Sequence, residues 1–194
     1  AHPRPAARAG DLIDPSTMNT AMERAAAVRL MAFDVDGTLT DGSLNIGPEG
    51  EAFKRFSVRD GLGLVLLAQA GIQVAIVTGR RSAIVEQRAR ELRIETVLQG
   101  VADKAQALRE LCATHGLSLA QAGFMGDDWP DLPAMGIVGF AATVPDAATE
   151  VRRAAHWTAR LPAGGGAARE LAEFVLDSQG LLDQMLGRFD GRIA

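Results

Sequence analysis

The sequence predicts an α/β fold, a doubly wound (Rossmann-like) parallel sheet with helices on both faces. Two observations carry this prediction. Short, continuous apolar runs alternate along the chain with segments of helical periodicity, and such runs are typical of parallel strands buried on both faces. The chain has 194 residues, of which 47% are hydrophobic and 23% charged, the composition of an ordinary globular protein. This length fits one domain with a sizeable core.

The expected elements follow in chain order. Strands are expected at Leu30–Val35, Ile72–Val77, Thr96–Leu98, Ala122–Met125 and Ile137–Ala142, with a weak one near His156–Thr158. Helices are expected at about 62–70, 81–92, 103–115, 131–135, 146–153 and 167–185. The longest uncharged run, 61–79, contains a break at Gly71, so it divides into a helix and a strand rather than spanning a membrane.

Two segments stand outside this alternation. Residues 43–58 contain two short strand patterns around the turn Gly47-Pro48-Glu49-Gly50, which predicts a protruding β-hairpin. Residues 1–27 are expected to form a loose, disordered N-terminal tail, and residues 28–187 the folded domain. The first 20 residues lack the apolar core of a secretory signal.

Composition excludes several classes of function. The net charge of −4 gives no basic surface for nucleic acid or an anionic membrane. The single cysteine, Cys112, excludes an internal disulfide and favours a reducing compartment, so we expect a cytoplasmic protein.

Polar side chains stand where the expected strands end. Asp34 and Asp36 close the first strand, Thr78 the second, Lys104 begins a helix after the third, and Asp127 follows the fourth. The carboxyl ends of parallel strands meet at one edge of a sheet, so these groups should converge there. Carboxylates without histidine or cysteine suit Mg²⁺, which prefers one or two carboxylates, waters and a substrate phosphate.

This set fits the hydrolysis of a phosphate ester. Asp34 would attack phosphorus as a carboxylate nucleophile and form an aspartyl phosphate that water hydrolyses. Asp36 would protonate the leaving alcohol and then activate the water. Lys104 and Thr78 would hold the phosphate and stabilise charge in the transition state.

These residues, in this order, resemble the haloacid dehalogenase superfamily of aspartate-nucleophile phosphatases. The resemblance covers residues 30–131 through Asp34-Val35-Asp36-Gly37-Thr38, Thr78, Lys104 and Gly126-Asp127-Asp128-Trp129-Pro130-Asp131. It implies the roles given above, with Mg²⁺ held by Asp34, Asp127 and the backbone carbonyl of Asp36. It also implies that Asp128 and Asp131 orient the metal waters and Lys104.

A narrower resemblance extends over about 30–185. The stretch from Lys54 to Gly63 is similar to the signature of the 3-deoxy-D-manno-octulosonate 8-phosphate phosphatases, as is the glycine-rich segment leading into Arg169-Glu170. The chain departs from that family at Ala163, where a glycine is usual, and at Gly165, often basic. The implied substrate is an acidic sugar phosphate on the way to lipopolysaccharide. The residues expected to bind it are Lys54, Arg59, Asp60, Gly61, Gly79, Arg80 and Arg169.

Motif spacing leaves no room for a cap domain. Only 41 residues separate Asp36 from Thr78, 25 separate Thr78 from Lys104, and 22 separate Lys104 from Asp127, fewer than the ~50 that an independent domain needs. A lone hairpin is marginal in water, so residues 43–58 are the natural element of self-association. The resemblance implies a homotetramer with active sites at subunit interfaces.

Two other interpretations remain open. The same chemistry could serve a nine-carbon acidic sugar phosphate of the sialic-acid type, which a panel of substrates would distinguish. A non-catalytic regulatory or assembly module is the other, although the complete set of Asp34, Asp36 and Lys104 argues against it. A phosphomutase is disfavoured because such enzymes need a cap to exclude water.

Overall fold

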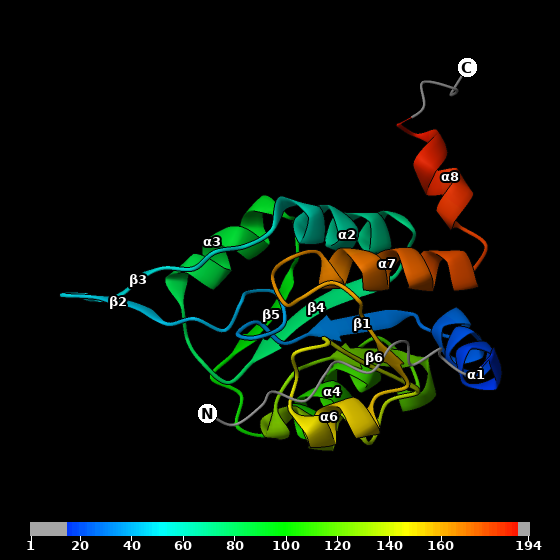
Figure 1. Ribbon diagram of the computed structural model, residues 1–194, viewed down its shortest axis with the longest axis horizontal. Coiled ribbons are helices and arrows are strands. Elements are labelled where there is room, and N and C mark those ends of the chain that lie inside the picture. The colour runs from blue at the N-terminus through cyan, green and yellow to red at the C-terminus, as the bar shows by residue number, and fades with distance from the viewer. Residues whose placement is uncertain (1–14, 190–194) are drawn as a thin grey trace, which may run out of the picture.

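A six-stranded parallel sheet forms the centre of the molecule (Figure 1). The computed structural model describes residues 15–189. The strand order is β5-β4-β1-β6-β7-β8, and every pair within the sheet is parallel. The strands are β1 (Leu30–Phe33), β4 (Gln73–Thr78), β5 (Thr96–Gln99), β6 (Ala122–Met125), β7 (Phe140–Thr143) and β8 (Trp157–Thr158). The doubly wound fold predicted from the sequence is confirmed.

Helices cover both faces of this sheet. The α-helices of the described residues are α1 (Pro15–Ala26), α2 (Val58–Gln69), α3 (Ala83–Glu91), α4 (Lys104–Thr114), α5 (Leu132–Met135), α6 (Thr149–Ala154), α7 (Ala167–Ser178) and α8 (Leu182–Gly187), of which α8 extends away from the sheet (Figure 1). Figure 1 shows α2 and α7 side by side over one face and α4 and α6 across the other. The central strands are fully buried, which explains their continuous apolar sequence.

The order in which the chain adds strands to the sheet reverses beside β1. From β1 it winds outward through β4 and β5, and then crosses back to β6, β7 and β8 on the other side. Ligands of doubly wound sheets bind beyond the carboxyl ends of the strands at such a switch point. The ends of β1, β4 and β6 therefore define where a site should lie.

Three expectations about elements need correction. The helix expected over 167–185 is two helices, because the chain turns at Gly180, which has a φ of +68°. The strand expected at 137–142 begins only at Phe140. The region expected to be a loose tail contains helix α1, whose Ala21 and Ala25 are buried against the core; residues 1–14 lie outside the described part.

The hairpin protrudes from the sheet, but its paired part is shorter than expected. Strands β2 (Asn45–Gly47) and β3 (Gly50–Phe53) pair with each other only, and Figure 1 shows them extending away from the body of the molecule. The segment ends before residue 58 because Ser57 caps α2, accepting hydrogen bonds from the amides of Arg59 and Asp60. No helix within residues 15–189 is long and apolar enough to span a membrane.

Candidate active site

A buried cluster of three carboxylates and one lysine lies at the switch point. Lys104 donates to Asp34 at 2.7 Å and to Asp131 at 2.5 Å. Oxygens of Asp34, Asp127 and Asp131 all lie within 4.8 Å of one another. We call Asp34, Lys104, Asp127 and Asp131 the carboxylate–lysine cluster.

Each member of the cluster is placed by a regular element. Asp34 follows the last residue of β1, and its amide donates to the carbonyl of Met125 in β6. Lys104 is the first residue of α4, which Asp103 caps. Because main-chain hydrogen bonds fix both ends, the ammonium group and the carboxylate meet although 69 residues lie between them.

Burial and neighbouring charges shift the pKa values of the cluster. It raises the pKa of Asp34 to about 6 despite the opposing effect of Lys104. The pKa of Asp127 is raised to about 7, by burial first and then by the nearby charges of Asp34 and Asp131. Burial alone would lower the pKa of Lys104, but its two carboxylate partners raise it above its ordinary value. Negative charge is thus in excess here, and a cation would relieve it.

The loop after β1 closes over Asp127. Gly37 has a φ of +91°, and a Cβ at this position would collide with the Asp127 carboxylate, so only glycine fits. Thr38 is fully buried and donates from its hydroxyl to Asp127 Oδ1 at 3.1 Å. This contact fixes the orientation of the Asp127 carboxylate.

The donor set fits a hard divalent cation. Both Asp131 oxygens are engaged, one by Lys104 and the other by the amides of Asp127 and Asp128. In contrast, Lys104 occupies only one oxygen of Asp34, and the second oxygen of Asp127 and the backbone carbonyl of Asp36 accept no hydrogen bond from any described residue. These oxygens suit Mg²⁺, which binds one or two carboxylates and completes its octahedron with water and a substrate phosphate.

Thr78 supplies a further polar group next to the cluster. It is the last residue of β4 and is 3% exposed. Its hydroxyl makes no hydrogen bond to another group within residues 15–189, and it is not among the fully buried atoms that lack a partner, so it is accessible. An accessible hydroxyl without a protein partner is suited to a ligand oxygen.

Asp36 is not part of the cluster and joins three other charged residues at the rim of the site. It pairs with Lys54, and its Oδ2 lies 3.5 Å from Arg80 Nε. Glu51 of the hairpin lies 2.9 Å from Lys54 Nζ and 3.8 Å from Arg80 Nη2. We call Asp36, Glu51, Lys54 and Arg80 the rim quartet. Lys54 is enclosed, with a side chain only 2% exposed, whereas that of Arg80 is 48% exposed.

Four of the expected substrate-binding residues lie elsewhere. The Asp60 carboxylate accepts the amides of Gly166 and Arg169 at the start of α7, so it joins α2 to α7. A Cβ on Gly61 would collide with the Arg88 guanidinium, so this glycine serves packing. Arg59 and Arg169 line a separate surface cavity of about 450 Å³, whose lining includes no member of the cluster.

The remaining two expectations concern Gly79 and Asp128. Gly79 follows Thr78 in an exposed position, with open space around it apart from the carbonyl of Val101. The Asp128 side chain caps the short 3-10 helix Trp129–Asp131 and, among the described residues, does not contact Lys104. Only Asp131 of the two makes the contact with Lys104 that was expected.

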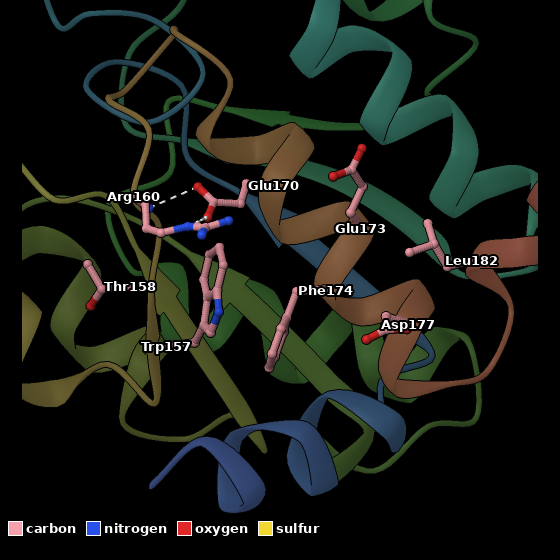
Figure 2. Close-up of a pocket in the computed structure, with 8 residues that line it drawn as sticks. All are labelled: Trp157, Thr158, Arg160, Glu170, Glu173, Phe174, Asp177 and Leu182. Carbon is pink, nitrogen blue, oxygen red and sulfur yellow. Dashed lines mark hydrogen bonds and ion pairs between the residues drawn. The ribbon is translucent and has the colours of Figure 1, made fainter. Parts of the chain in front are cut away.

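The motif Arg169-Glu170 has a structural use. Glu170 accepts hydrogen bonds from the amides of Arg160 and Leu161 and from the Arg160 side chain, as Figure 2 shows for Arg160. This ties the chain after β8 to the first turn of α7, and Gly164 of the intervening loop donates to the carbonyl of Thr38 at 3.2 Å. A cavity of about 410 Å³ adjoins Glu170 and Trp157, and its lining includes no member of the cluster or the rim quartet.

Sequence reasoning placed Thr38 in the first motif but gave it no role, and it missed Glu51 and Ser82. Glu51 accepts a hydrogen bond from the hydroxyl of Ser82, which caps α3. The sequence did contain a signal for Glu51, because it stands three residues before Lys54. Pairs of opposite charge at this spacing are common on hairpins that bind no ligand, so the signal was weak.

No known protein-family model matches the chain. It is similar to the 3-deoxy-D-manno-octulosonate 8-phosphate phosphatase KdsC of Yersinia pestis, with 41% identity over 166 residues, 86% of this chain and 89% of that relative. The crystal structure of the corresponding Moraxella catarrhalis phosphatase, in complex with magnesium, phosphate and KDO, has a TM-score of 0.86 at 41% identity and covers 89% of this chain and 99% of that one. The cobalt-bound Haemophilus influenzae phosphatase gives 0.81 at 36% identity, covering 84% and 98%.

Proposed function

The chain belongs to the family of 3-deoxy-D-manno-octulosonate 8-phosphate phosphatases, in the haloacid dehalogenase superfamily, and from this premise we propose how it acts. It hydrolyses 3-deoxy-D-manno-octulosonate 8-phosphate to 3-deoxy-D-manno-octulosonate and phosphate, a step toward lipopolysaccharide. The observation that carries this proposal is the carboxylate–lysine cluster at the switch point, beside the unpartnered hydroxyl of Thr78.

Asp34 is the nucleophile. Its carboxylate attacks phosphorus, the bond from phosphorus to the sugar oxygen breaks, and an aspartyl phosphate forms. The contact with Lys104 supports this role, because the ammonium group holds the carboxylate in one orientation and offsets the phosphate charge. Thr78 Oγ1 donates to a phosphate oxygen.

Asp36 is the acid and base. It protonates the leaving sugar oxygen and then takes a proton from the water that hydrolyses the aspartyl phosphate. Its carboxylate is not part of the cluster and is held by Lys54 and Arg80 at the rim of the site. This separation of the two carboxylates supports their different roles.

Mg²⁺ is the proposed cofactor, held by Asp34, Asp127 and the carbonyl of Asp36. When bound, it supplies positive charge that neutralises the phosphate and the excess carboxylates. Asp131 keeps Lys104 and the backbone of Asp127 in place through its two oxygens. Titration of the protein with Mg²⁺, followed by calorimetry, should show binding that D127N weakens at least tenfold.

Arg80 is the cation that meets the substrate carboxylate. Its side chain is half-exposed at the rim, and its guanidinium has donors beyond those facing Asp36 and Glu51. Lys54, enclosed by its two carboxylate partners, acts instead by holding Asp36. Arg59 and Arg169 could contribute only from a neighbouring subunit.

A homotetramer with active sites at subunit interfaces is the proposed assembly. The hairpin supports it, because Ile46 is 74% exposed and Phe53 57% exposed on an element that packs poorly alone. Light scattering should give four subunits in the wild type and fewer in an I46S/F53S variant. A fully active wild-type monomer would contradict this assembly.

The cytoplasm is the expected location, and Cys112, buried and unpaired, is compatible with a reducing compartment. The expected domain limits, 28–187, likewise stay a prediction, although α1 packs against the core before residue 28. A truncation that begins at residue 28 would remove α1, so its loss of thermal stability would show that the folded unit starts earlier.

Phosphate release from a panel of sugar phosphates tests the proposed function. The panel contains the eight-carbon substrate, a nine-carbon acidic analogue and a neutral sugar phosphate, each with Mg²⁺ and with EDTA. Preference for the eight-carbon acid, lost in EDTA, is the expected result. Preference for the nine-carbon acid would change the substrate alone, and no turnover would favour a non-catalytic role.

A further inference from the structure

Glu51 is more enclosed than the large apolar side chains of the hairpin. It lies on β3, and its side chain is only 19% exposed, whereas Ile46 and Phe53 of the hairpin are largely exposed. Its two oxygens contact two different parts of the molecule. One lies 2.9 Å from Lys54 Nζ, and the other accepts a hydrogen bond from the hydroxyl of Ser82. Glu51 therefore fastens the hairpin to the start of α3.

The same carboxylate also flanks Arg80. Glu51 Oε1 lies 3.8 Å from Arg80 Nη2, while Asp36 Oδ2 lies 3.5 Å from Arg80 Nε. The guanidinium is thus held between two carboxylates from different segments of the chain. The hydrogen bonds from Ser82 and Lys54 outweigh burial and hold the pKa of Glu51 below its ordinary value, so it is ionised at neutral pH.

We propose that Glu51 is a positioning residue for substrate recognition: it holds Lys54 and Arg80 in place beside Asp36, so that Arg80 meets the carboxylate of an acidic sugar phosphate. This inference rests on the proposed function, because it requires a substrate with a carboxylate at the rim. Glu51 does not touch the reacting atoms and acts through Arg80.

Glu51 affects the binding of an acidic substrate in two opposing ways. Its negative charge repels an anionic substrate, so charge alone would make removal of Glu51 tighten binding. Orientation works the other way, because an arginine side chain loses rotamer entropy on being fixed. A guanidinium already flanked by two carboxylates has lost part of that entropy before substrate arrives. At a half-exposed site, Coulomb repulsion is screened, so orientation dominates and removal weakens binding.

The test compares E51Q with E49Q on two substrates. Glu49, in the hairpin turn, is exposed and its side chain makes no hydrogen bond or ion pair with the other described residues, so E49Q is a matched change of charge. For the eight-carbon acidic sugar phosphate, E51Q should raise KM about tenfold with kcat within about threefold of wild type. With p-nitrophenyl phosphate, which has no carboxylate, kcat/KM should be unchanged. E49Q should match wild type on both.

A double variant tests whether Glu51 acts through Arg80. If it does, E51Q/R80A loses no more than R80A alone on the acidic substrate. E51D, which keeps the charge on a shorter side chain, should recover part of the loss. Should E51Q fail to fold, Ser82→Ala removes the other contact of the same carboxylate and must give the same selective, smaller rise in KM.

Several results would overturn the inference. They are an unchanged or lower KM in E51Q, an equal loss on both substrates, and losses that add fully in the double variant. A wild-type enzyme without preference for the acidic substrate would overturn the proposed function instead. Wild-type preference combined with an E51Q variant that behaves as wild type overturns only the role of Glu51.

Discussion

The carboxylate–lysine cluster and the rim quartet adjoin at the end of β1 but are built by different means. Asp34, Lys104 and Asp131 are each at most 6% exposed, and strand ends or helix starts place them. In the rim quartet, Glu51 and Lys54 come from the hairpin and Arg80 from a loop, and their ion pairs with Asp36 hold them together. The sheet and its helices thus position the residues proposed to catalyse the reaction, while contacts between side chains position those proposed to recognise the substrate. Substitutions in the cluster should abolish turnover of every substrate, and those at the rim should change the choice among substrates.

The largest effect is expected from Asp34→Asn. The amide cannot attack phosphorus, so phosphate release should fall by about 10⁴-fold or more on every substrate of the panel. The fold should persist, because Asn keeps the size and one acceptor for Lys104. Circular dichroism and thermal unfolding provide the control. Substantial turnover in this variant would exclude the covalent route.

Lys104→Met should come next. Methionine preserves the length of the side chain but leaves Asp34 and Asp131 without their shared cation in a buried site. We expect kcat to fall by about 10²- to 10³-fold on acidic and neutral substrates alike. Steady-state kinetics on both substrates measure it, and a loss confined to the acidic substrate would assign Lys104 to the rim instead.

Arg80→Ala, compared with Arg169→Ala, locates the group that reads the substrate carboxylate. Arg80→Ala should raise KM about tenfold or more for the acidic substrate and leave KM for the neutral substrate unchanged. The Arg169 side chain donates to Glu173 at 2.7 Å. In the I46S/F53S hairpin variant, if it is monomeric, Arg169→Ala should therefore leave KM unchanged for both substrates. If Arg169→Ala has the larger effect in the assembled wild type, a neighbouring subunit supplies the cation.

The same division explains what the sequence could and could not predict. Lys104 begins the helix after β5. Asp34, Thr78 and Asp127 stand at or just after the ends of the buried strands β1, β4 and β6, so finding these strands placed the cluster at the correct edge of the sheet. Local periodicity sufficed because both faces of these strands are buried. The meeting of Asp131 with Lys104 rested on the family resemblance, and the structure bears it out.

Contacts between side chains distant in sequence were not predictable in this way. The Asp60 carboxylate reaches the amides of Gly166 and Arg169 at the start of α7, more than a hundred residues further along the chain. Periodicity also gave no sign of the pairing between Glu51 and Ser82. Helix α1 was missed because its apolar positions are mostly alanines, such as Ala21 and Ala25, whose burial depends on tertiary packing.

The smallest predicted effect concerns the stability of the metal-free protein. Burial raises the pKa of Asp34 to about 6 and that of Asp127 to about 7 in the folded chain, whereas both ionise near 3.9 when unfolded. Between about pH 4 and 7 the folded state therefore binds protons that the unfolded state has released, so the free energy of unfolding falls as pH rises through this window. In EDTA, thermal stability should be lower at pH 8 than at pH 5.5.

Asp127→Asn isolates this effect from the rest of the chain. The amide keeps an acceptor for Thr38 and removes a charge that burial disfavours, so the metal-free variant should gain about 1–2 kcal/mol at pH 8, allowing for the partial exposure of the group. Asp177→Asn, at an exposed position without a partner among the described residues, should leave the pH dependence unchanged. Mg²⁺ should stabilise the wild type at pH 8 more than it stabilises D127N, because D127N lacks one of the two charged ligands. A metal-free D127N that is less stable than wild type at pH 8 would mean that Asp127 stabilises the fold. The cluster would then not be a set of destabilising charges retained for catalysis, and its contrast with the rim quartet, which serves recognition, would not hold.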